Sequence, residues 1–223
     1  MDIASAFTFV FDDKEWLKKL AIGGGLALVA AIMTPVIVGL ALTFPLDGYR
    51  LQVLKNVRDG QPLPLPEWNQ FGDFFRMGLM VFIIRLVYNL PALLVACPLI
   101  AIYVATPFLE LDPEFTSTLN LISIACWSCL LPLLALVGNA LFPAALIRYA
   151  EQETLASAFQ FREVFSFISS HLSDYVIALL LALVAGTIAS FGFIICLVGV
   201  LFTNFWSVLV SANLYGQLAK EST

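Results

Sequence analysis

The sequence predicts an all-α integral membrane protein: a helical bundle with two long spans, a C-terminal helical hairpin, an N-terminal re-entrant hairpin and amphipathic helices at the membrane surface. Composition is the first reason. The chain is 61% hydrophobic and only 12% charged, whereas soluble proteins carry about 25% charged residues. The second reason is the presence of four apolar runs that exceed the roughly 20 residues needed to cross a bilayer core as a helix. We expect all 223 residues to form a single membrane domain.

The four apolar runs cover residues 20–46, 78–106, 118–147 and 175–214. The last run is about 40 residues long and would measure roughly 60 Å as one helix, about twice the thickness of the bilayer core. It is therefore predicted to form two spans, with Gly192 and Gly199 bracketing the turn. The second and third runs each contain two prolines, which predict kinks within a span.

Lysine and arginine are unevenly distributed over the loops between these runs. Residues 107–117 contain three acidic residues and no basic one, whereas residues 47–77 and 148–174 carry most of the arginines. Basic loops of membrane proteins stay in the cytoplasm. We therefore expect residues 107–117 to face outside, and the two basic loops and both termini to face the cytoplasm.

The first apolar run has basic residues at both ends, with Lys19 before it and Arg50 shortly after it. A single crossing would place one of these basic clusters outside. A bend at Thr34-Pro35, near the middle of the run, would keep both clusters inside. We expect a re-entrant or shallow helical hairpin with limbs of about 13 residues, which are too short to cross. A single crossing with the N-terminus outside is the alternative.

The segments outside the apolar runs have the pattern of amphipathic helices at the membrane surface. In residues 1–19, Asp12 and Glu15 have the spacing of a capping box for a helix that continues through Trp16. A proline-rich linker follows Asp59-Gly60, and aromatic stripes come after it. The stripes consist of Trp68, Phe71, Phe75 and Leu79 in one case, and of Phe161, Phe165, Ile168 and Leu172 in the other. Packing of these faces on the bundle is the alternative reading.

A polar cluster inside the membrane is the first candidate site. Arg85 is the one full charge well inside an apolar run, and Asn89 lies one helical turn further on. Asn139 would lie at a similar depth in the antiparallel neighbouring span. A charged group in a span faces the protein interior or snorkels to an interface. The cluster therefore predicts either an interhelical polar contact or a site for a ligand or solute.

A ribbon of small residues is the second candidate. Ala178, Ala182, Gly186 and Ser190 recur every four residues along the penultimate span. Small residues at this spacing let another helix approach closely. The ribbon predicts a packing face that is used within the chain, by a protein partner or by a second copy of the chain.

The sequence offers little for catalysis, and we expect no cofactor and no metal. His171 is the only histidine, and no nucleophile has an evident base. Cys126 and Cys129 have the spacing of a redox pair but lie in a span, where thiolates are disfavoured. The triplet of glycines at 23–25 lacks the context of a phosphate loop, which favours close helix packing. Basic residues are too few for a nucleic-acid surface.

Several short motifs resemble those of an uncharacterised prokaryotic family of polytopic membrane proteins, a domain of unknown function. They are Phe11-Asp12-Asp13, Trp16 with Lys18-Lys19, Ile22-Gly23-Gly24, Gly48-Tyr49, Asn56-Val57-Arg58, Leu65-Pro66-Glu67-Trp68, Gly72-Asp73, Phe161-Arg162-Glu163-Val164 and Tyr215-Gly216-Gln217. The resemblance covers nearly the whole chain. It implies a bacterial or archaeal protein of the cytoplasmic (inner) membrane and supplies no activity.

Three functions fit the sequence. A non-enzymatic scaffold or accessory subunit of a membrane complex fits the lack of catalytic groups and the small-residue ribbon. A small-solute or lipid transporter or channel fits Arg85 and the proline-broken spans. A membrane enzyme fits least well. We expect the partners to be membrane lipids, with a protein partner or a homo-oligomer in the membrane, and no nucleic acid.

Overall fold

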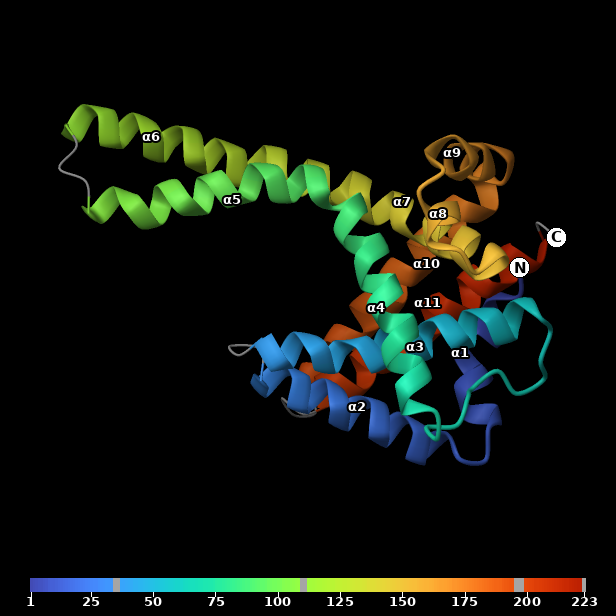
Figure 1. Ribbon diagram of the computed structural model, residues 1–223. Coiled ribbons are helices and arrows are strands. Elements are labelled where there is room, and N and C mark those ends of the chain that lie inside the picture. The colour runs from blue at the N-terminus through green and yellow to red at the C-terminus, as the bar shows by residue number, and fades with distance from the viewer. Residues whose placement is uncertain (34–36, 109–111, 195–198, 222–223) are drawn as a thin grey trace. The chain divides into compact units, whose positions relative to one another are not determined.

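A computed structural model describes residues 1–33, 37–108, 112–194 and 199–221 (Figure 1). Helices make up nearly all of this part of the chain, and it contains no strand. The chain divides into two compact units, the first formed by Met1–Ile84 with Ala144–Thr223 and the second by Arg85–Pro143. The predicted all-α class is confirmed.

Two helical hairpins form the centre of the first unit. The first pairs α2 (Trp16–Met33) with α3 (Ile37–Arg58), and the second pairs α10 (Leu172–Ser190) with α11 (Gly199–Glu221). Helix α11 packs against both α2 and α3, so the two hairpins share one core. The split of the last apolar run into two helices, with Gly199 starting the second, is as predicted.

The first apolar run is broken, as the sequence predicts, but its limbs are longer than expected. The predicted bend at Thr34-Pro35 lies outside the described residues. Helices α2 and α3 contain 18 and 22 residues, because each continues into the polar sequence beyond the apolar run. By length and composition α2 could cross a membrane, whereas α3 is not among the candidate spans. The re-entrant hairpin therefore stays a prediction.

Glycines of the first hairpin bring α2 against α11. A Cβ atom at Gly23 would overlap the ring of Phe205, and one at Gly24 would overlap the ring of Phe202. The space beside Gly25 is open. The predicted role of the glycine triplet in close helix packing is confirmed for its first two members.

Each hairpin is preceded by a short helix, α1 (Ile3–Asp12) or α9 (Phe161–Ser170). Helices α1, α2 and α3 contain 10, 18 and 22 residues, and α9, α10 and α11 contain 10, 19 and 23 residues. This near-equality indicates that a unit of one short helix and one hairpin occurs twice in the chain. The expected start of a helix at Asp12 was wrong. Asp12 is the last residue of α1, and α2 starts at Trp16, with the Asp13 carboxylate accepting the backbone N–H of Glu15 ahead of it.

Helix α4 (Phe71–Tyr88) crosses α3 in the first unit (Figure 1). The crossing uses the same motif, Phe-x-x-x-Gly, on both helices. A Cβ atom at Gly48 would overlap the backbone carbonyl of Phe74, and one at Gly78 would overlap that of Phe44. Each glycine therefore admits the backbone of the other helix at the position of its phenylalanine, as small residues do in membrane helix pairs.

The second apolar run is bent sharply between two helices. Helix α4 ends at Tyr88, α5 (Leu90–Ala105) starts after Asn89, and the two axes differ by 72°. The break falls where Pro91 occupies the first turn of α5, a position that tolerates proline because its missing N–H has no helical partner there. Pro98 lies inside α5 without ending it.

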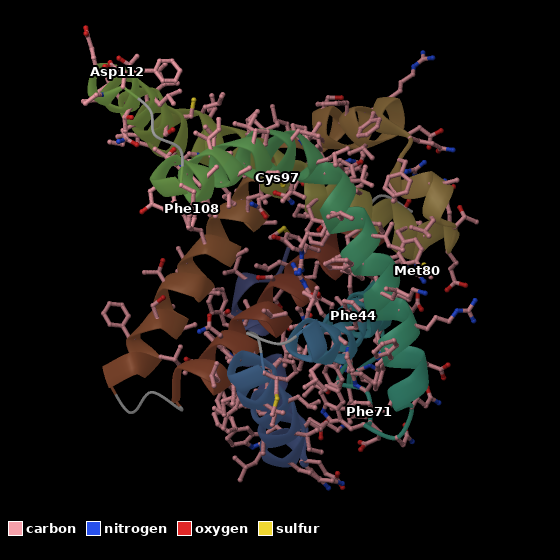
Figure 2. All side chains as sticks on the ribbon, turned by 60° about the vertical axis from the view of Figure 1, so that its left-hand side comes forward. Phe44, Phe71, Met80, Cys97, Phe108 and Asp112 are labelled. Carbon is pink, nitrogen blue, oxygen red and sulfur yellow. The ribbon has the colours of Figure 1, made fainter. Side chains whose placement is uncertain are left out.

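The third apolar run forms one long helical segment. It consists of α6 (Pro113–Ala125), a π-helical turn (Cys126–Leu130) and α7 (Leu131–Gln152). The first turn of α6, capped by the Asp112 carboxylate, occupies part of the predicted outer loop 107–117. Residues 109–111 of that loop lie outside the described residues. Figures 1 and 2 both show α5 running beside α6.

Three helical segments are long and apolar enough to cross a membrane. They are Trp16–Met33, Pro113–Gln152 and Leu172–Ser190. The bent pair of α4 and α5 would make a fourth if it counts as one span. Between α7 and α10, the four-residue helix α8 (Leu155–Ala158) and α9 replace the single surface helix expected for residues 148–174.

Candidate functional site

The Arg85 region lies at the start of the second unit, at the last turn of α4. The Arg85 guanidinium carbon stands 5.0 Å from the centroid of the Phe142 ring, within range of a cation–π interaction. The side-chain amide of Asn89 donates to the backbone carbonyl of Arg85 at 3.0 Å. Arg85 and Asn89 are therefore adjacent, as their spacing predicts. The sequence analysis missed Phe142, because nothing in the pattern singles out one phenylalanine among 19.

Asn139 is exposed, and its amide donates to the carbonyl of Ala135 on its own helix at 2.8 Å. The residue before it, Gly138, is buried, and a Cβ atom there would come within 2.6 Å of the carbonyl oxygen of Tyr88. The closest approach of α7 to the helix break thus occurs at Gly138. The cluster that these contacts describe is Arg85, Asn89 and Phe142, with Gly138 as the point of backbone contact.

The small-residue ribbon on α10 is only partly buried. Ala178 is fully buried, whereas Ser190 is exposed and the space beside Gly186 is open. The buried face of α10 instead follows Tyr175, Ala178, Ala185 and Ala189. A strict spacing of four residues drifts off one face of a helix with 3.6 residues per turn, and alternating steps of three and four stay on it. Within the described residues, the C-terminal part of the ribbon, at Gly186 and Ser190, is therefore not covered by another helix.

A buried ion cluster, which we call the Lys19 site, joins the start of α2 to the linker between α3 and α4. The Lys19 Nζ atom donates to Asp13 Oδ2 at 2.7 Å and to the carbonyl of Leu65 at 3.0 Å, and it lies 2.7 Å from Glu67 Oε1. The Lys19 side chain is only 6% exposed, against 9% for Asp13 and 51% for Glu67. An ammonium group has three donors, and these three acceptors use all of them.

Aromatic stacking and hydrogen bonds fix the linker beside this cluster. The Trp68 indole donates to the carbonyl of Lys19 at 3.1 Å and stacks on the Tyr49 ring at a centroid distance of 4.3 Å. The Tyr49 hydroxyl donates to the carbonyl of Pro66 at 3.0 Å, and the Asn56 amide donates to that of Pro64 at 2.8 Å. Three linker carbonyls thus find donors, as buried backbone groups must. The sequence predicted a proline-rich linker here, and its anchoring was not anticipated.

Burial would by itself raise the pKa of Asp13. The hydrogen bonds from Lys19 and from the backbone N–H of Glu15 outweigh it and hold the pKa of Asp13 below its ordinary value. The carboxylate is therefore ionised and paired. The sequence signal for this site was the set of short motifs around Asp13, Lys19 and Trp68, whose residues meet in space.

Two further motifs, those with Gln217 and with Glu163, also make contacts within the protein. Gln217 on α11 accepts from the backbone N–H of Asp2 at 2.6 Å and donates to the carbonyl of Asp2 at 3.0 Å, which ties the start of the chain to α11. Glu163 on α9 pairs with Arg148, and Val164 next to it is fully buried. The Nδ1 atom of His171 forms a hydrogen bond with Ser170 Oγ at 3.0 Å, and the tautomer of the ring decides which of the two donates.

Three of the four cysteines lie among the described residues. Cys97, Cys126 and Cys129 are free thiols, and the described residues contain no group of three or more metal-binding side chains. Cys126 and Cys129 lie in the π-helical turn, a rare element that occurs frequently at functional sites. In this chain the turn adds one residue to the long segment from α6 to α7.

A family model described as "Protein of unknown function (DUF4013)" matches residues 26–198. The chain belongs to this family. The match includes Tyr49, Glu67 and Trp68 of the linker contacts, and it begins after Asp13 and Lys19. The expected resemblance to an uncharacterised family is confirmed. No curated protein and no solved structure matches the chain.

Proposed function

We propose that this protein is a multi-pass protein of a prokaryotic cytoplasmic membrane that catalyses no reaction and serves as a scaffold or accessory subunit of a membrane complex. One observation carries the proposal. The first part of the segment Pro113–Gln152 exposes large apolar side chains, among them Leu121 at 70%, Leu133 at 58% and Leu136 at 66%, whereas residues 144–147 near its end are buried. An apolar surface of this extent needs a cover of lipid or of a partner protein.

The polar groups of the Lys19 site support a structural role for this part of the first unit. The Lys19 ammonium uses its three donors within the protein, and the linker carbonyls at Pro64, Leu65 and Pro66 are bonded. Groups with all their hydrogen bonds satisfied stabilise a fold and have none to offer a substrate. The exposed apolar side chains of the second unit form the surface that we propose for a protein partner.

The test is photo-crosslinking in intact membranes from a photoreactive residue at position 136. Leu183 on α10 provides the matched control, because it is 67% exposed and also lies on an apolar helix. We expect a protein adduct of one discrete size at position 136 and none at position 183. The proposal is wrong if positions 121, 133 and 136 all yield lipid adducts only.

Transport is the second candidate function, and the break at Asn89 favours it. Discontinuous membrane helices form solute sites in many transporters, and Arg85 lies one turn before this break. The substitution Arg85→Leu separates the two functions. A scaffold should lose thermal stability in detergent or the adduct at position 136. A transporter should keep both and lose solute uptake in proteoliposomes.

For the arrangement in the membrane, we propose residues 107–117 outside and residues 50–77, 148–174 and both termini in the cytoplasm. The distribution of arginines supports this orientation. The two limbs α2 and α3 return the chain to its starting side whether they dip into the membrane or cross it fully. Helices α1 and α9 would then lie at the cytoplasmic surface, where the exposed side chains of Phe161 and Phe165 meet lipid.

A further inference from the structure

A polar pocket of about 520 Å³ lies in the first unit, away from the Lys19 site. Its walls come from the second half of α3, the first half of α4 and the end of α7. Lys55, Asp73, Arg76 and Glu153 supply charged groups, and methionines of α4, including the Met80 labelled in Figure 2, supply apolar surface. We call it the α3–α4–α7 pocket.

The pocket carries two positive and two negative side chains. Lys55 Nζ pairs with Glu153 Oε1 at 2.6 Å, and the Lys55 side chain is mostly buried. Asp73 and Arg76 are exposed, and neither has an ion-pair partner in the part of the chain that the structure describes. One free carboxylate and one free guanidinium therefore face the same space, three residues apart on α4.

Glu153 adopts an unusual backbone conformation at this pocket. Its φ is +55°, a value that glycine normally supplies just after the end of a helix. The residue follows α7, which ends at Gln152. A side chain in this conformation is strained, and such strain gathers at functional sites. Here the carboxylate at this position holds Lys55 against the pocket wall.

We propose that the α3–α4–α7 pocket binds the zwitterionic headgroup of phosphatidylethanolamine. The guanidinium of Arg76 matches the phosphate, because arginine forms forked hydrogen bonds with it. The carboxylate of Asp73 matches the ammonium group, and Met77 and Met80 contact the glycerol end. A purely anionic headgroup would meet the carboxylates of Asp73 and Glu153, and a simple cation would meet Arg76. The site rests on the membrane placement proposed above, since Met77 and Met80 lie where the apolar run of α4 begins.

The test measures thermal stabilisation of the full-length protein in detergent by three probes. These are short-chain phosphatidylethanolamine, short-chain phosphatidylglycerol and free phosphoethanolamine. We expect phosphatidylethanolamine to stabilise the protein most. Arg76→Gln should weaken binding of both lipids about tenfold, the effect of losing one charged hydrogen bond. Asp73→Asn should weaken the binding of phosphatidylethanolamine only, so that the protein no longer prefers one lipid over the other.

Arg162→Gln is the matched control, because Arg162 is an exposed arginine on α9 outside the pocket. This variant should bind as the unmodified protein does. Equal stabilisation by the two lipids, or equal losses in Arg162→Gln and Arg76→Gln, would overturn the proposal. Stabilisation by free phosphoethanolamine as large as by the lipid would assign the pocket to a soluble ligand instead. If the protein sediments with membranes but fails these tests, the proposed lipid site is wrong and the proposed membrane placement stands.

Discussion

Lys19 is a cation buried at the start of an apolar helix, and its two carboxylate partners differ in exposure. Asp13 is as buried as Lys19, whereas Glu67 is half exposed. Removing one partner of a buried ion pair leaves an unsatisfied charge, but an exposed partner is replaced by water. The two carboxylates should therefore contribute unequally to stability.

We expect Asp13→Asn to lower the free energy of unfolding by roughly 3 kcal/mol and Glu67→Gln by about 1 kcal/mol or less. Thermal unfolding of the detergent-solubilised protein measures both. Lys18→Gln is the control, because its ion pair with Glu15 is exposed on both sides. Equal losses in the two carboxylate variants would show that burial does not set the strength of this cluster.

The lowered pKa of Asp13 should make the stability of the folded protein depend on pH. The pKa of its carboxyl is lowered in the folded protein, so its contribution is fully present above the unfolded value of about 3.9. It is lost as the pH falls through the lower folded value. The melting temperature of the protein should therefore decline in acid below that point, and the decline should be shallower in Asp13→Asn. An identical acid profile in the two proteins would contradict this assignment.

The crossing of α3 and α4 is the contact between elements that tolerates least change. Gly48 and Gly78 each face a backbone carbonyl, which cannot move aside as a side chain can. Overpacking costs about 1–3 kcal/mol, and we expect Gly48→Ala and Gly78→Ala to reach the upper part of this range. Gly72→Ala, on the same helix with open space beside it, should be neutral or slightly stabilising. Thermal unfolding of the three variants checks this order.

The elements also show how far the sequence determines the fold. Hydrophobic length predicted the two helices of residues 175–214, and the basic residues at both ends predicted the division of residues 20–46. It did not predict the break at Asn89, because Pro91 and Pro98 look alike in the sequence while one starts a helix and the other lies inside it. A proline fixes the local backbone, and the neighbouring helices decide which outcome follows.

The candidate sites were harder to predict than the helices. The spacing of Arg85 and Asn89 was sufficient to place them together, whereas Phe142 came from another helix. The Lys19 site depends on Leu65 and Glu67, which a linker brings back to the start of α2. Contacts between residues this far apart leave no periodic signal in one sequence. The motifs contain the residues of this site, but the sequence predicted no site there.

At the scale of the whole molecule, the unit of a short helix and a hairpin occurs twice, as α1–α3 and as α9–α11. Helices α4 to α8 lie between these two copies in the sequence. In the sequence, the pair Phe9 and Phe11 precedes the first hairpin by the same offset as the pair Phe165 and Phe167 precedes the second, which agrees with this duplication. If both copies enter the membrane from the same side, the basic loops collect on that side and residues 107–117 reach the other. The orientation proposed above rests on this arrangement together with the arginine distribution.

Cysteine labelling from outside the cell tests the membrane account most directly. The background is a variant in which Cys97, Cys126, Cys129 and Cys196 are replaced by serine. A single cysteine is then placed at Thr116 in α6 or at Gln61 in the linker after α3. The account predicts that an impermeant thiol reagent labels position 116 in intact cells and labels position 61 only after the cells are opened. Labelling of both positions in intact cells, or of position 61 alone, would contradict it.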